Sequence, residues 1–360
     1  MLRKQGWMVV ALLVLLLMFG SVGAWAQDDC GLAESDCALL AESDAVMAQL
    51  GAAAFKLDTT FALEYFLLPE SYTFRAVVDG VYSIPPEENI ASDDVLKLLR
   101  NLNSSVVVMM EVPAIDGVPL LPAGFDDMLT LDLSLVDGIG YANFDKLAQV
   151  DSTFPSGWYG VDLLEFYSTL LALVGDQGTP AITGEVDALT RAITETSTYS
   201  RIDDQQRGGQ TLAVYELSGS MADVLADSRA RDALEDYVLT TLESSFEGLY
   251  TYAELLQASE IYTTLAERIT YRLTRIVGED DAYLHRFEFS LLFQPDSQTL
   301  LDLNNVVDPL GLAALIFDIR LDVALDLSSF NEVPLVEAPA NAELIPLEDL
   351  LPGITDEGGF

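Results

Sequence analysis

The sequence predicts an α+β protein in which helices cover the concave face of a strongly curved antiparallel sheet, a half-barrel. Three observations lead to this fold class. Several segments alternate apolar and polar residues, as strands with one dry and one wet face do. Two blocks, 161–174 and about 221–265, change to helical period. Half of the 360 residues are hydrophobic although the formal net charge is −41, so the chain has enough apolar side chains for a large core.

The first 26 residues have the parts of a cleavable signal peptide. Arg3 and Lys4 precede an uncharged apolar run at 7–19, and Ala-Trp-Ala at 24–26 is a small-x-small cleavage site. The run is shorter than the ~20 residues that span a bilayer. We expect cleavage after Ala26 and a secreted or otherwise extracytoplasmic protein, in the periplasm or cell envelope. An uncleaved membrane anchor is the alternative.

The mature chain, residues 27–360, is expected to form a single domain with a helical insertion at about 221–265, since no Pro/Gly/Ser-rich linker divides it. Its charge limits its partners. Loss of Arg3 and Lys4 leaves 15 basic residues against 58 acidic ones, a charge of about −43. Such a polyanion repels phosphate backbones, which excludes nucleic acid. It gains no attraction from anionic lipid head groups, so membrane contact is transient at most, and a basic envelope protein is a possible partner.

The two cysteines, Cys30 and Cys37, follow the signal peptide closely. Export favours a disulfide that closes this short loop, and two free thiols are the alternative. The bridge would hold an N-terminal helix and perform no chemistry. Ser35 or Asp36 is the expected cap of that helix, and its apolar stripe would be Leu39, Val46, Leu50 and Ala54.

Strand patterns dominate the next hundred residues. Asp79-Gly80 is a possible two-residue hairpin turn inside its segment, and Asp137-Gly138 is the best hairpin signal in the chain. The expected strands are Phe61–Tyr65, Phe74–Tyr82, Val106–Val112, Leu129–Leu135 and Ile139–Phe144.

The second half mixes helices and longer strands. In the block near 221–265 an apolar residue recurs every four positions, at Leu234, Val238, Leu242, Phe246 and Tyr250. The expected strands are Thr194–Ile202 and Thr211–Leu217, joined at Arg207-Gly208-Gly209, and then 269–273, 283–293 and 317–327. The last two are about eleven residues long, beyond the usual five or six, which suits a strongly curved sheet.

The sequence lacks the residues of common catalytic and metal sites. His285 is the single histidine, and its strand position beside Phe287 indicates a packed or rim side chain. No Gly-x-Ser-x-Gly elbow, EF-hand loop or phosphate-binding glycine loop is present. We therefore expect no catalytic residue, no metal and no cofactor, and a protein that is not an enzyme.

Four segments resemble the LppX/LprAFG lipid-carrier family, whose fold is related to that of the lipoprotein carrier LolA. They are the hairpin at 133–141, the Gly-Trp-Tyr-Gly-Val-Asp stretch at 157–162, the strand at 209–219, and the ending at 325–339 with its Val-Pro-Leu-Val-Glu-Ala-Pro. The resemblance implies a cavity for lipid or glycolipid between a half-barrel sheet and helices. Two features depart from the family. The residues before Cys30 form no lipobox for a lipidated cysteine, and the helical block at 221–265 looks longer than is typical.

The leading hypothesis is therefore extracytoplasmic binding or carriage of a lipid or other apolar small molecule. Its expected wall consists of apolar strand residues under a helical cover of Leu242 and Phe246. The wall residues are Phe61, Leu63, Tyr65, Leu131, Leu133, Tyr271, Leu273, Phe287, Phe289 and Leu291.

Two alternatives remain. An envelope sensor or protein-interaction scaffold would keep this fold but have a packed interior and no ligand. A secreted hydrolase would use two carboxylates, but the sequence nominates no pair for that role.

Overall fold

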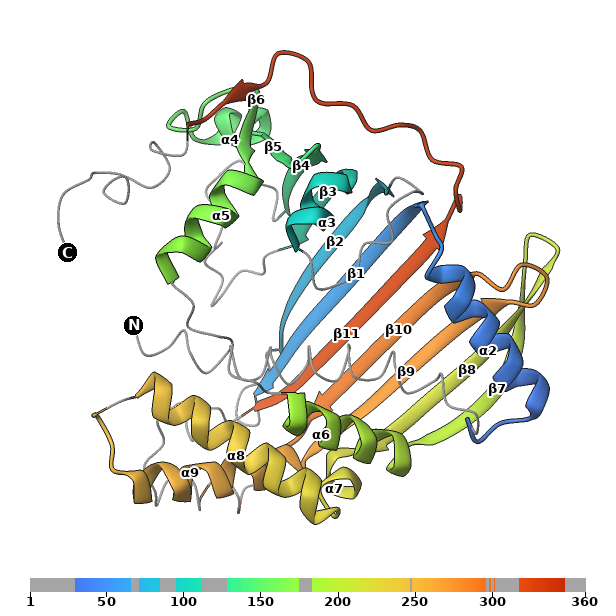
Figure 1. Ribbon diagram of the computed structural model, residues 1–360, viewed down its shortest axis with the longest axis vertical. Helices are drawn as coiled ribbons and strands as arrows, with labels where there is room; N and C mark the ends of the chain where they lie inside the picture. Colours follow the sequence, from blue (N-terminus) through green and yellow to red (C-terminus); the bar gives the residue numbers. More distant parts are fainter. Residues whose placement is uncertain are drawn as a thin grey trace. The chain divides into compact units, whose positions relative to one another are not determined.

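The computed structural model (Figure 1) describes residues 30–65, 71–84, 95–111, 128–174, 183–246, 248–295, 298, 301 and 317–346. Its strands form a twelve-stranded sheet in the order β12-β6-β5-β4-β3-β2-β1-β11-β10-β9-β8-β7, which does not close into a barrel. Helices accompany the sheet, so the expected α+β class is confirmed. The sheet is mixed rather than purely antiparallel, because the two-residue strand β12 (Glu343–Leu344) pairs with β6 in parallel.

The expected signal peptide lies outside the described residues. Within the described part of the chain, no helix is both long and apolar enough to cross a bilayer.

The chain forms two compact units, each made of separate stretches of sequence. Unit 1 comprises 1–47, 60–73 and 179–324, and unit 2 comprises 48–59, 74–178 and 325–360. The single domain expected over 27–360 stays a prediction.

Unit 1 contains the long strands of the second half of the chain and most of the helices. Its strands are β7 (Thr198–Arg207), β8 (Gln210–Ser220), β9 (Ile269–Gly278), β10 (Leu284–Phe293) and most of β11 (Phe317–Ser328). Its helices are α2 (Glu34–Met47), α6 (Thr183–Thr196), α7 (Met221–Val224), α8 (Ser228–Ser245) and α9 (Tyr252–Ala266). The helices α7, α8 and α9 occupy the block in which the sequence showed helical period.

One face of this sheet packs against the helices and forms the main core. The stripe predicted on α8 is buried, since Leu234, Val238 and Leu242 all belong to the core, as does Phe246 at the helix end. The chain turns after Phe246 and restarts at α9, where Thr251 and Glu254 form a capping box. The segment that shows this apolar period therefore forms two packed helices rather than one.

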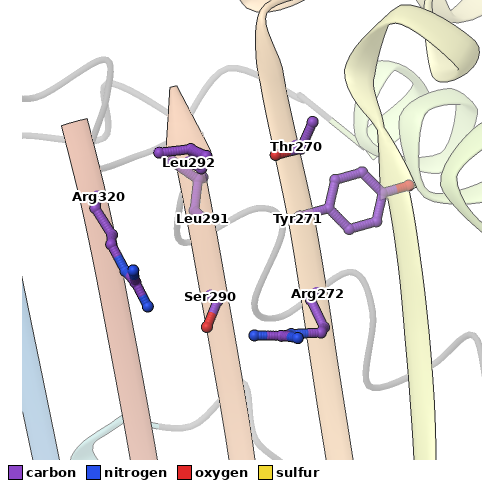
Figure 2. Close-up of a pocket in the computed structure, with 7 residues that line it drawn as sticks. All are labelled: Thr270, Tyr271, Arg272, Ser290, Leu291, Leu292 and Arg320. Atoms are coloured by element: carbon purple, nitrogen blue, oxygen red, sulfur yellow. The ribbon is translucent and has the colours of Figure 1, made fainter. Parts of the chain in front are cut away.

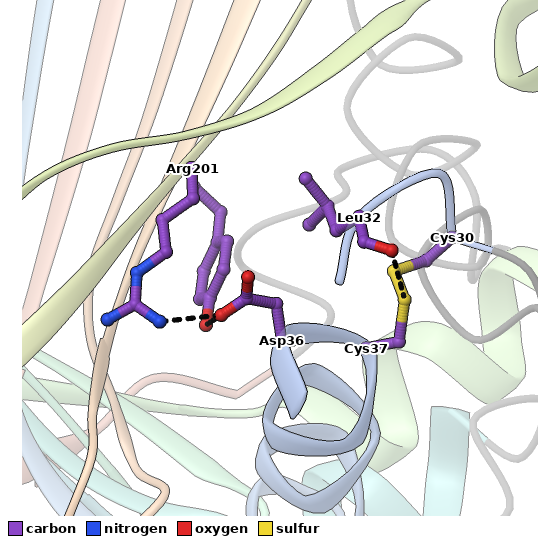
Figure 3. Close-up of a disulfide and its surroundings, with 6 residues drawn as sticks. Cys30, Leu32, Asp36, Cys37 and Arg201 are labelled. Carbon is purple, nitrogen blue, oxygen red and sulfur yellow. Dashed lines mark hydrogen bonds and ion pairs between the residues drawn. A yellow bond between two sulfur atoms is a disulfide. The ribbon is translucent and has the colours of Figure 1, made fainter. Parts of the chain in front are cut away.

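Helix α2 crosses strands β7, β8 and β9, and polar side chains attach it (Figures 1 and 3). Buried Asp36 accepts hydrogen bonds from Arg201 Nη1 at 2.6 Å and from the Tyr215 hydroxyl at 3.1 Å. The pKa of Tyr215 is raised, mainly by burial and also by the neighbouring Asp36 carboxylate. About two helical turns further on, Asp44 forms an ion pair with buried Arg275 of β9. The helix is thus fixed to the sheet by two carboxylate–arginine pairs.

The expected disulfide is confirmed. Cys30 and Cys37 are bonded, with Cα atoms 5.8 Å apart, and the bridge ties the segment before α2 to its first turns (Figure 3). The expected cap and stripe were wrong, however. The helix begins at Glu34, and its fully buried face consists of Asp36, Leu40 and Ser43. These follow helical spacing, but two of them are polar, so an apolar pattern does not reveal them.

Unit 2 contains the shorter elements between β1 and α5. Its strands are the first part of β1 (Ala52–Tyr65), most of β2 (Ser71–Ser83), β3 (Asn103–Glu111), β4 (Met128–Val136), β5 (Ile139–Asn143), β6 (Trp158–Asp162) and β12. Its helices are α3 (Val95–Asn101), α4 (Asp145–Val150) and α5 (Leu163–Val174). The hairpin predicted at Asp137-Gly138 is confirmed, because both residues have positive φ, 52° and 82°, between paired β4 and β5.

The turn predicted at Asp79-Gly80 was wrong. Strand β2 runs straight through it, with Asp79 opposite Val107 and Gly80 opposite Val106. A Cβ atom at position 80 would lie 2.3 Å from the Ser105 carbonyl oxygen and 2.6 Å from Val106 Cγ1. The glycine is present because the neighbouring strand approaches closely, which is the other common reason for glycine inside a strand.

We expect Gly80→Ala to lower the free energy of unfolding by about 1–3 kcal/mol, since the added methyl group meets backbone rather than a flexible side chain. Gly51→Ala is the matched control, because the atom closest to its Cβ would be 3.4 Å away, an ordinary contact. Urea unfolding followed by circular dichroism measures both. Equal stability of the two variants would contradict the close approach.

Replacing Asp44 with Asn should cost about 3 kcal/mol, because it removes a carboxylate that forms an ion pair with the buried Arg275 side chain. Asp58→Asn serves as the control. It removes a carboxylate from the partly exposed Arg75–Asp58 pair and should cost less than about 1 kcal/mol. Urea titrations of both variants test this order, and a reversed order would show that α2 is not held by its Asp44 pair.

Candidate apolar ligand-binding surface

Most of the predicted wall and cover residues of the second half of the chain lie in the filled core of unit 1. Apart from half-buried Phe287, their side chains are between 1% and 4% exposed, so they pack against one another and against the helices. They are Tyr271, Leu273, Phe287, Phe289, Leu291, Leu242 and Phe246. Their burial accounts for the stability of unit 1, and any contact with a ligand stays a prediction.

The predicted residues in unit 2 are packed less completely. Leu131 and Leu133 of β4 are half-buried, and in the sheet register they lie opposite Val108 and Val106 of β3. On the far side of β3, Val108 is paired with Val78 of β2. The apolar residues of one strand thus meet those of the next on a single face of the sheet.

We call this set the apolar face of unit 2. Phe55 of β1 joins it, because its ring centroid lies 6.1 Å from that of Tyr82. All of its members are half-buried, so water reaches each of them in part. They are Phe55, Leu57, Val78, Tyr82, Val106, Val108, Met110, Leu129, Leu131 and Leu133.

The opposite face of the same strands carries ions. Arg75 of β2 donates from Nε to Asp58 of β1 at 2.9 Å, and its Nη1 lies 3.5 Å from Glu111 of β3. Lys146 Nζ lies 3.9 Å from Asp132 of β4. These polar residues alternate with the apolar ones along each strand, so the two sets point to opposite faces. The face with the ions also carries Val81 and Val136, which pack with Tyr141 and Val336 in a small buried cluster, so it is partly ionic and partly core.

Helix α5 begins beside this face. Gly140 of β5 allows it to approach, since a Cβ there would lie 2.9 Å from Leu163 Cδ1, and a Cβ at Gly138 would lie 2.6 Å from Leu164 Cδ1. Several residues in the first half of α5, including Phe166 and Tyr167, are half-buried, as are the residues of the apolar face of unit 2. The helix therefore brings further apolar side chains that are only partly covered.

Tyr82 is an ionisable group on the apolar face. Burial raises the pKa of its hydroxyl, so this side chain stays neutral at physiological pH. A neutral, partly wet apolar surface attracts alkyl or aromatic groups and gives no charge with which to hold an ion.

The remaining predicted wall residues belong to strand β1. Phe61 and Leu63 are half-buried in unit 1, whereas the side chain of Tyr65 lies outside the described residues. Sequence reasoning missed Phe55, Val78 and the helical partners Leu163 and Phe166. Two features of the sequence lie next to some of these residues in the fold. They are the apolar run at 106–110, which pairs with the strand of Val78, and the glycines at 138 and 140, which adjoin the start of α5.

The described residues contain no group of three or more His, Cys, Asp or Glu side chains placed to hold a metal. His285, predicted to be packed or at a rim, is partly buried, and its Nε2 lies 3.1 Å from Asp281 Oδ2 in the turn between β9 and β10. The packed or rim position expected for His285 agrees with this contact.

The solved structures that this chain matches include two mycobacterial lipoproteins and a LolA superfamily protein. Lipoprotein LppX of Mycobacterium tuberculosis matches with a TM-score of 0.32 and 9% identity, over 83% of this chain and 97% of that one. LprF of Mycobacterium bovis matches with 0.33 and 11%, over 84% and 96%. A LolA superfamily protein of Nitrosomonas europaea matches with 0.15 and 10%, over 79% and 87%.

These are the families that the sequence motifs resemble. No protein-family model matches the chain, and neither does any curated protein. At these TM-scores, function has to be argued from the residues of this chain.

The difference in burial predicts a difference in stability. Leu273→Ala should cost about 3 kcal/mol or more, because it opens a cavity in a filled core. Leu131→Ala should cost about 1 kcal/mol, since its side chain already meets water in part. Urea unfolding of the two variants measures both. If Leu131→Ala is as costly as Leu273→Ala, the apolar face of unit 2 is ordinary core.

Proposed function

We propose that this protein binds a lipid or other apolar molecule on the apolar face of unit 2 and carries it outside the cytoplasm. The observation that carries the proposal is the incomplete burial of that face. A protein normally covers such a continuous set of Val, Leu, Met and aromatic side chains, and an uncovered set of this kind marks a binding surface.

The energy of such binding is sufficient without any ion pair. Each buried methylene contributes ~0.8 kcal/mol, so an acyl chain of about 16 carbons could gain ~13 kcal/mol before the costs of ordering. The half-buried leucines and valines of the face would lose their remaining contact with water at the same time. A neutral apolar surface therefore suits an alkyl ligand.

The extracytoplasmic part of the proposal rests on the Cys30–Cys37 bond and on the signal-peptide pattern before it. Structural disulfides persist in oxidising compartments such as the periplasm or the extracellular medium. The large negative charge suits a carrier that remains in solution and touches membranes transiently.

One observation favours the scaffold alternative. The sheet–helix interior of unit 1 is filled by its own side chains, as expected for a sensor or interaction protein that binds no ligand there. The two functions differ in whether the purified protein holds an apolar molecule.

Solvent extraction of protein purified without detergent, followed by mass spectrometry, should recover a lipid. After delipidation, the protein should bind a fluorescent acyl probe. Leu131→Gln should weaken probe binding about tenfold, because a polar group then lines the surface that the alkyl chain must cover. The measurement is a fluorescence titration.

Leu249→Gln is the matched control, since Leu249 is exposed on the turn before α9 and outside the apolar face. It should bind the probe like the unchanged protein. Absence of both lipid and probe binding would overturn the carrier proposal and leave the scaffold. Equal loss in the two variants would show that the probe binds elsewhere.

A further inference from the structure

A pocket of about 300 Å³ lies on the sheet of unit 1, across the adjacent strands β9, β10 and β11 (Figure 2). Tyr271 is directed away from it, toward the other face, and belongs with Leu291 to the filled core. The side chains on the pocket face follow the strand alternation. They are Thr270 and Arg272 of β9, Ser290 and Leu292 of β10, and Arg320 of β11.

Arg272 has no partner in the part of the chain that the structure describes. Its residue is exposed and lies directly opposite Ser290 in the β9–β10 register. Carboxylates greatly outnumber basic residues in this protein, 58 to 17, and other arginines of unit 1 such as Arg201, Arg231 and Arg286 are paired with them. An arginine without a partner at a pocket has all its N–H donors available for a ligand.

Arg320 is held in place from the other side of the pocket. Its Nε donates to Asp322 Oδ2 at 2.6 Å, and Asp322 Oδ1 also accepts from the Ser290 hydroxyl at 2.7 Å. Both guanidinium groups, those of Arg272 and Arg320, point toward Ser290 (Figure 2). Nη1 of Arg320 makes no hydrogen bond within the described residues, so it too can donate.

The charge of the cluster defines the ligand. Two guanidinium groups face the Asp322 carboxylate, and Glu64 also acts on Arg320 from nearby, so the cluster carries at most one positive charge. Glu288 on the pocket side of β10 is already paired with Arg286 at 2.6 Å. A singly charged anion balances this site better than a doubly charged one.

The geometry favours an anion with two free oxygens. The two arginines approach from opposite sides of Ser290, so one ligand satisfies both only if its oxygens point in different directions. The two oxygens of a carboxylate and the two non-bridging oxygens of a phosphodiester both diverge from a central atom, so either group meets this condition. The Thr270 hydroxyl at the rim provides a further donor.

We propose that this pocket binds a singly charged oxyanion through two of its oxygens. The anion is a carboxylate, a free phosphodiester or the phosphodiester in the head group of a phospholipid. The pocket lies in unit 1, and the apolar face proposed for lipid binding lies in unit 2, so either site can fail while the other stands.

The test uses the full chain and Arg272→Gln. Arg229→Gln is the control, because Arg229 is likewise exposed and without a side-chain partner in the described residues, but lies on α8 away from the pocket. NMR titrations at low ionic strength with dimethyl phosphate, followed by ³¹P, and with acetate, followed by ¹H, measure the free phosphodiester and the carboxylate. Flotation with vesicles of phosphatidylglycerol in phosphatidylcholine, against phosphatidylcholine alone, measures the lipid head group.

We expect Arg272→Gln to weaken binding about tenfold or more, because it removes charge-assisted hydrogen bonds, and Arg229→Gln to leave it unchanged. Loss in the dimethyl phosphate titration supports a free phosphodiester as the source. Loss in the acetate titration alone supports a carboxylate, and loss in flotation alone supports a lipid head group. Binding in none of the assays, or equal binding by both variants, would overturn the proposal. Circular dichroism of Arg272→Gln checks that the exposed substitution leaves the fold intact.

Discussion

The alternation of side chains along each strand is the constraint on which this structure depends. Successive residues must point to opposite faces of a sheet, so a strand with apolar residues at every second position creates a face that avoids water. In unit 1 the helices cover that face and complete a filled core. In unit 2 the corresponding face, from Val78 through Val108 to Leu131, stays half-buried. One sequence pattern thus produces a core in one unit and a candidate binding surface in the other.

Electrostatics acts under a second constraint, the scarcity of cations. With 17 basic residues against 58 acidic ones, most arginines have a carboxylate within reach, and several hold the fold together. Arg201 and Arg275 fasten helix α2 through Asp36 and Asp44, and the disulfide closes the loop before that helix. Arg272 departs from this pattern, which is why the pocket beside it is informative about ligands.

Local signals in the sequence were reliable where short-range physics decides the conformation. Asp137-Gly138 and Gly208-Gly209 form tight turns, because these residues tolerate positive φ at low cost. The four-residue period of Leu234, Val238 and Leu242 was buried as expected. The turn predicted at Asp79-Gly80 was wrong. The glycine is needed there because a neighbouring strand approaches closely, not because its own backbone conformation requires it. The same holds for Asp36, which looked like a helix cap and is a buried partner of Arg201.

The sequence by itself determined the α+β class, the main hairpins, the apolar faces of the strands and the cysteine pair, because each depends on residues close together in the chain. The tertiary structure decided which apolar faces are filled and which stay partly open, because burial depends on helices supplied by distant segments. It also placed Arg272, Ser290 and Arg320 on three neighbouring strands. These residues are too far apart in the sequence for a local pattern to predict that they lie close together.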